Sequence, residues 1–132
     1  MAVTILRFGV IYGPRPCNWS AVKSLFDSVK NKEEVFVGSL KTGRRLIHVD
    51  DICAGILAAV GQTDFEIFNI SSDSTVTLGQ VIKESRRIHG TTPRVTESSP
   101  EKIGLRNPSN LKAKQQLNWS PLVLLSDGLK SL

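Results

Sequence analysis

Two adjacent carboxylates, Asp50 and Asp51, are the residues whose types and spacing first suggest acid–base chemistry. Paired carboxyl groups can act as proton donor and acceptor in many active sites. Both residues, however, come directly before an apolar pattern with helical spacing. Acidic side chains at a helix start accept hydrogen bonds from free backbone amides and stabilise the helix dipole. We therefore interpret Asp50 or Asp51 as the helix cap, and His48 just before them as a core residue.

The cysteines and the only tyrosine of the chain offer little further chemistry. Cys17 and Cys53 do not form a Cys-x-x-Cys motif, so the sequence predicts no metal site and no redox pair. Thiols in such contexts are typical of inert cysteines in a reducing cytosol, which favours a cytoplasmic protein. Tyr12 ends an apolar run and is interpreted as a structural residue that closes a buried strand.

Length and charge narrow the classes of function. A chain of 132 residues with 40% apolar content predicts one compact domain. No apolar run approaches the roughly 20 residues that span a bilayer, so no membrane partner is expected. The net charge of +5 is dispersed along the chain, which disfavours a nucleic-acid partner and favours phosphate-bearing small ligands.

Hydrophobic periodicity predicts alternating strands and helices. The first segment, 3–12, has little alternation and is typical of a strand covered on both faces. Asn18 or Ser20 is placed to begin the first helix, and Thr77 begins a helix with a capping-box pattern. Strands are expected at 34–37, 45–49 and 65–70, and helices at 18–30, 52–60, 78–89, 111–117 and 122–129.

This alternation predicts an α/β class with mixed short strands and helices. The chain opens with a strand rather than with a complete crossover unit. No Gly-x-Gly-x-x-Gly turn lies between a strand and a helix, so the usual cradle for a dinucleotide pyrophosphate is missing.

Four blocks carry a resemblance to a known family. Residues 6–15 resemble an Arg-x-x-x-x-Tyr-Gly-Pro segment, and 38–51 resemble a Gly-rich loop followed by an arginine and a strand ending in Val-Asp-Asp. Residues 68–72 resemble a Tyr-Asn-Ile-Gly-Ser strand end, and 112–121 a Lys-Ala-x-x-x-Leu-Gly-Trp-x-Pro close. In this order and spacing, the chain is similar to NAD-dependent epimerases and dehydratases of nucleotide sugars, of the extended short-chain dehydrogenase type.

The resemblance implies a C-terminal portion of such an enzyme. Residues 1–132 would be a single substrate-binding domain that opens with one late strand of the dinucleotide-binding sheet. The N-terminal Rossmann sheet, with its Gly-rich loop and its Tyr-x-x-x-Lys catalytic pair, would precede residue 1. Tyr12 cannot supply that pair because Pro16 occupies the lysine position. We therefore expect no catalytic residue here, and NAD or NADP bound by the full-length parent rather than tightly by this chain.

The same resemblance implies a substrate site. Arg44 matches the arginine that grips the diphosphate of a sugar nucleotide, a role suited to its fork of donors. Arg106 is the candidate for a second diphosphate arginine, although the pattern around it departs from the family. Val10 stands where many members carry a substrate-binding asparagine. Gly38, with the loop after it, would cover the base and ribose, and Phe36 is the aromatic that could join them.

Two functions remain open at this stage. The first is a nucleotide-sugar-binding part of an epimerase, dehydratase or reductase, with a nucleoside-diphosphate sugar and the missing Rossmann domain as partners. The second is a naturally truncated, non-enzymatic module that binds or regulates a protein partner. In either case the chain should expose apolar surface where another domain packs, which favours self-association and a possible homodimer.

Overall fold

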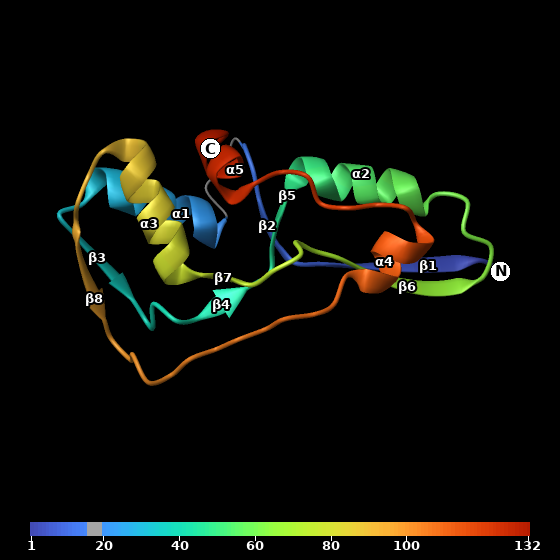
Figure 1. Cartoon of the computed structure of the whole chain (residues 1–132), viewed down its shortest axis with the longest axis horizontal. Helices are drawn as coiled ribbons and strands as arrows, with labels where there is room; N and C mark the ends of the chain where they lie inside the picture. The colour runs from blue at the N-terminus through green and yellow to red at the C-terminus, as the bar shows by residue number, and fades with distance from the viewer. Residues whose placement is uncertain (16–19) are drawn as a thin grey trace.

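Short strands and short helices alternate along the chain in the computed structural model, which describes residues 1–15 and 20–132 (Figure 1). The predicted α/β class is confirmed. The strands are β1 (Val3–Phe8), β2 (Val10–Tyr12), β3 (Glu34–Val37), β4 (Gly43–Arg44), β5 (Leu46–His48), β6 (Phe65–Ile70), β7 (Val76–Thr77) and β8 (Arg94–Glu97). The helices are α1 (Ala21–Asn31), α2 (Val49–Ala59), α3 (Leu78–His89), α4 (Leu111–Gln116) and α5 (Leu125–Lys130).

The first predicted strand is divided at Gly9. Its first part, β1, pairs in parallel with β6, and its second part, β2, pairs in parallel with β5. The Gly9 amide still donates to the Ile70 carbonyl, whereas the Val10 amide donates to the Arg45 carbonyl at 2.9 Å. A Cβ at position 9 would lie 2.5 Å from that Arg45 oxygen, so only glycine allows the two backbones this close. The change of partner places Val10 beside the Arg44–Arg45 corner.

The expectation that the first strand is covered on both faces is wrong for β1. Leu6 packs against the core cluster that includes Phe68 and Ile70, but Ile5 is 40% and Phe8 is 41% exposed. Within the described residues β1 pairs with β6 along one edge only. Helices α2 and α4 contact this strand pair, but Ile5 and Phe8 stay exposed, whereas parallel strands are normally covered on both faces by helices.

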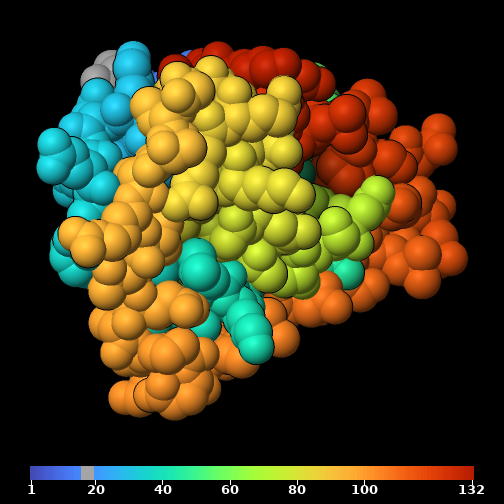
Figure 2. All heavy atoms as spheres, turned by 60° about the vertical axis from the view of Figure 1, so that its left-hand side comes forward, coloured from blue at the N-terminus to red at the C-terminus, as the bar shows by residue number. Residues whose placement is uncertain are grey.

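Helices α1, α3 and α5 form a second packing unit. Their apolar faces meet around Val22, Phe26, Val81 and Leu129, and Figure 2 shows α3 between α1 and the C-terminal segment. Thr77 and Gln80 form the predicted capping box of α3, which ends at Gly90 with φ of 67°. Ser20 caps α1 as expected. The alternative cap, Asn18, and also Cys17 lie outside the described residues.

The start of α2 differs from the prediction. The cap is His48, whose Nδ1 accepts from the Asp50 amide at 3.3 Å, and the helix begins at Val49. The early start turns the Asp51 side chain inward, where it is 5% exposed. Its two carboxylate oxygens accept from the Leu122 and Val123 amides at 2.9 and 3.0 Å.

The contact with Asp51 also determines the path of the C-terminal segment. Residues 122–124 were expected in a helix, but they lie outside it, and α5 begins at Leu125. Trp119 is buried and donates from Nε1 to the Asp51 carbonyl at 3.1 Å. Asp51 of α2 therefore holds the segment from Trp119 to Val123. Strands β7 and β8 were not predicted. None of the helices in the described residues is long and apolar enough to cross a membrane.

Replacing Asp51 should therefore destabilise the fold. Asp51→Ala removes two buried hydrogen bonds to a charged group and leaves two amides without an acceptor, so we expect a loss of about 2 to 3 kcal/mol in the free energy of unfolding. Urea denaturation followed by circular dichroism measures it. The control is Asp50→Ala, because the Asp50 side chain is 79% exposed. Equal losses for the two variants would contradict this role of Asp51.

The open edge of β1 gives a second prediction. The chain alone should self-associate as its concentration rises, because Ile5, Phe8 and the neighbouring Phe65 expose apolar surface on the β1–β6 pair. Sedimentation velocity at increasing concentration measures this. Ile5→Lys should shift the chain toward monomer, whereas Leu122→Lys, at an apolar position elsewhere that is even more exposed, should not. A monomer at every concentration would show that this face needs no cover.

Candidate functional site

A groove of about 620 Å³ brings together three arginines from distant parts of the sequence. Its walls come from the β1–β2 junction, from the β4–β5 corner and from the segment that leads to α4. The residues that line it are Phe8, Gly9, Val10, Arg44, Arg45, Arg106, Asn107 and Pro108. Three of the five residues predicted for the substrate site, Val10, Arg44 and Arg106, thus meet in one place.

Arg44 lines this groove, and one nitrogen of its guanidinium group is hydrogen-bonded to the chain. Its Nη1 donates to the Gly43 carbonyl at 2.8 Å and to the Gly104 carbonyl. Nε and Nη2 donate to no acceptor among the described residues. These donors are therefore available to an anion in the groove, while the Nη1 contacts fix the plane of the guanidinium.

Arg106 reaches the groove from the segment that leads to α4. Its amide donates to the Gly43 carbonyl at 3.3 Å, and the Gly43 amide donates to the Gly104 carbonyl at 3.0 Å. These two backbone bonds hold the 104–106 stretch beside β4. The Arg106 side chain is exposed and forms no hydrogen bond within the described chain. None of the salt bridges of the described residues involves Arg44, Arg45 or Arg106.

A smaller apolar cavity of about 230 Å³ adjoins the groove. The two share Val10 and Arg44 in their walls, and the cavity extends between α1, α3 and β5. Sequence reasoning missed its other walls, which are Ala21, Val22, Leu25, Thr42, Leu46, Val76, Leu78 and Val81. The walls from α1 and α3 were interpreted only as helix cores, and Leu46 as part of a strand. The result is a cationic compartment next to an apolar one.

Phe36 and Gly38 do not reach the arginine groove. Phe36 is 69% exposed on β3 and lines another hollow of about 440 Å³, which shares Ala21, Leu25 and Leu78 with the apolar cavity. Gly38 is exposed, with no atom within 4 Å of an added Cβ. The loop after it packs on the chain, since buried Ser39 donates to the Pro100 carbonyl at 3.1 Å.

The acid–base groups lie in a different part of the molecule. Tyr12 is buried against His48 at a ring distance of 5.3 Å, and His48 Nε2 lies 3.0 Å from Ser131 Oγ. Burial, with a smaller contribution from Asp51 and Asp127, raises the pKa of Tyr12 to about 12. A catalytic tyrosine base requires a lowered pKa, so this environment opposes that role. The described residues hold no cluster of His, Cys, Asp or Glu fit for a metal ion.

Comparison with known proteins identifies the family. Residues 1–71 match the model of the NAD dependent epimerase/dehydratase family, which covers more than half of the chain. The chain belongs to this family. Over 96% of its length it is 32% identical to UDP-glucuronic acid decarboxylase 1 of Arabidopsis thaliana, and over 97% it is 25% identical to UDP-glucuronate 4-epimerase of Thermodesulfobacterium geofontis.

A solved structure of this family matches the fold. The crystal structure of UDP-glucuronic acid 4-epimerase from Bacillus cereus, in complex with UDP-glucuronic acid and NAD, superposes with a TM-score of 0.80 at 27% identity. The match covers 97% of this chain and 43% of that one. The chain likewise spans 30% of the Arabidopsis relative and 41% of the Thermodesulfobacterium relative.

The fully described strand-to-helix junctions show how two helix starts of the chain are occupied. Two strand-to-helix junctions are fully described, and in both a side chain of the protein accepts a hydrogen bond from one amide of the helix start. His48 caps α2, and Thr77 with Gln80 caps α3. Neither of these two junctions has the Gly-x-Gly-x-x-Gly turn that brings a backbone close to a pyrophosphate.

The raised pKa of Tyr12 predicts an alkaline transition. Because the folded pKa of about 12 exceeds the ordinary 10.0, the folded chain keeps its phenol proton while the unfolded chain loses it. The free energy of unfolding should therefore be fully preserved below pH 10 and fall as the pH rises from 10 toward 12. Absorbance at 295 nm measures Tyr12 directly, since it is the only tyrosine. A midpoint near 10 under native conditions would contradict its burial, and Tyr12→Phe serves as the blank.

Proposed function

We propose that this chain is the nucleoside-diphosphate-sugar-binding part of an NAD-dependent epimerase or dehydratase and does not catalyse the reaction alone. The observation that carries the proposal is the convergence of Arg44 and Arg106 on one open groove beside an apolar cavity. The two arginines are 62 positions apart in the sequence, and the backbone bonds of Gly43 with Gly104 and Arg106 bring them to the same groove. A diphosphate between two guanidinium groups gives them a common partner.

The two compartments suit the two halves of such a ligand. In this proposal Arg44 binds diphosphate oxygens through Nε and Nη2, and Arg106 reaches them from the segment that leads to α4. The nucleoside, which has flat and weakly polar surfaces, enters the apolar cavity past Val10. Several relatives carry names that include UDP sugars, so UDP and its sugars are the first ligands to test.

In this proposal, residues that this chain does not supply carry out the hydride transfer. NAD supplies oxidation and reduction of the sugar in the family, and its binding requires a Gly-rich turn that residues 1–132 lack. Tyr12, the only tyrosine, lies in a buried environment that disfavours the phenolate. The chain accordingly binds and orients the substrate, while a dinucleotide-binding part performs the chemistry.

A non-enzymatic module of the same family is the second candidate. The exposed apolar side chains on β1, β6 and α2 favour it, since such surfaces mark sites of protein contact. It predicts a defined protein partner and no affinity for nucleotides. Calorimetry with UDP separates the two candidates.

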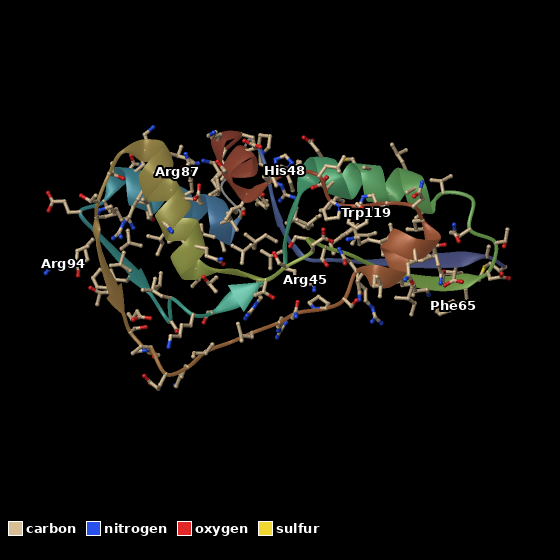
Figure 3. All side chains as sticks on the ribbon, in the orientation of Figure 1. Arg45, His48, Phe65, Arg87, Arg94 and Trp119 are labelled. Carbon is tan, nitrogen blue, oxygen red and sulfur yellow. The ribbon has the colours of Figure 1, made fainter. Side chains whose placement is uncertain are left out.

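Arg44 gives the direct test of the proposed function. Arg44→Ala should weaken the binding of UDP-glucuronate by about 1.5 to 3 kcal/mol, the range for a hydrogen bond to a charged group. Isothermal titration calorimetry measures the dissociation constant. Arg94→Ala is the matched control, because Arg94 is exposed on β8 at one end of the molecule, away from the groove (Figure 3).

The control removes the same charge, so it separates a local contact from the general attraction of a basic chain. An unchanged affinity in Arg44→Ala would remove Arg44 from the site. Equal losses in the two variants would reduce the binding to nonspecific electrostatics, which high salt should then abolish.

A further inference from the structure

Arg45, the neighbour of Arg44, has the opposite arrangement of contacts. Its Nε donates to Asn107 Oδ1 at 2.6 Å, and its Nη1 donates to the Ser72 carbonyl at 2.8 Å. A longer contact of 3.5 Å joins Nη1 to Asn110 Oδ1. Figure 3 shows Arg45 beside the segment that leads from β8 to α4. Its fork thus bridges the β6 end of the sheet and the residue that follows Arg106.

The segment from 98 to 110 has no helix or strand of its own and depends on such bridges. Before Arg106 it is held at Gly104, by the Gly43 amide and by Arg44. After Arg106 the first side-chain bond is the one from Arg45 to Asn107. The next bonds come at Ser109, whose carbonyl accepts from Asn69, and at Asn110.

We infer that Arg45 is a positioning residue for Arg106. The two adjacent arginines fasten the segment on either side of Arg106, so its backbone cannot move away from the groove. Arg45 acts through geometry, because its fork spans two neutral acceptors 35 positions apart in the sequence, Ser72 and Asn107. A side chain with a single donor point cannot make both bonds at once. This inference deepens the proposed function and rests on it for the role of Arg106.

The first experiment measures order and needs no ligand. Arg45→Ala and Asn107→Ala should each speed hydrogen exchange at the Arg106 amide and its neighbours, and leave the β1–β6 amides unchanged. Arg87→Ala is the matched control, since it removes an arginine with two hydrogen-bond partners on the distant helix α3. Unchanged exchange at Arg106 in both variants would overturn the inference, and faster exchange throughout the chain would reduce Arg45 to a general structural residue.

The second experiment is a double-mutant cycle on UDP affinity. Arg45→Ala should weaken UDP binding about fivefold to tenfold, roughly one net hydrogen bond. In the Arg106→Ala background it should have no further effect, because nothing is left to position. Asn107→Ala should match Arg45→Ala while keeping the Arg45 charge.

The outcomes separate the two ideas. If Arg45→Ala weakens binding equally with and without Arg106, or if Asn107→Ala has no effect, Arg45 acts by its charge and the positioning role is wrong. If the unmodified chain binds no UDP, the proposed function fails, and hydrogen exchange alone decides whether Arg45 holds the Arg106 segment.

Discussion

The contact between Gly9 and the Arg45 carbonyl is the constraint on which the arrangement of this chain depends. At that point the first strand leaves β6 and joins β5, and the missing Cβ of Gly9 is what allows the exchange. The exchange brings Val10 against the corner of β4 and β5, so that Arg44 and Arg45 emerge beside it on neighbouring positions. Without this step the groove would lose the wall that separates it from the apolar cavity.

The electrostatics of the groove follow from where its arginines find their partners. Arg44 and Arg45 donate to carbonyl oxygens and amide side chains, which orient them without neutralising their charge. No carboxylate is among the residues that line the groove. Asp73 is a carboxylate that interacts with Arg45 from outside the groove. Hydrogen bonds from Asn110 and Lys114, with a smaller effect of the Arg45 charge, keep the pKa of the Asp73 carboxyl below its usual range. A groove with three uncompensated cations gains more from an anion than one lined with ion pairs.

Local rules predicted most elements, and contacts distant in sequence account for the errors. The helix from Thr77 and the strand at 65–70 follow from capping and alternation, which need only neighbouring residues. Asp51 was read as a cap because its true partners, the amides of 122 and 123, lie some 70 positions away. For the site, motif spacing predicted Arg44 and Arg106, and the structure brings both to one groove. Phe36 lines a neighbouring hollow instead of the groove, since spacing alone does not say to which side of a short strand a side chain points.

The chain packs around two separate cores, and the groove lies near both of them. The β1–β6 pair, covered by α2 and α4, has its own core, while α1, α3 and α5 pack around another. The groove lies where segments from both meet, at Val10 and at the β4–β5 corner. The exposed side chains of β1 lie on the unit that carries no groove arginine. A second domain that covers β1 would still lie next to the groove, because Phe8 is both exposed on β1 and part of the groove wall.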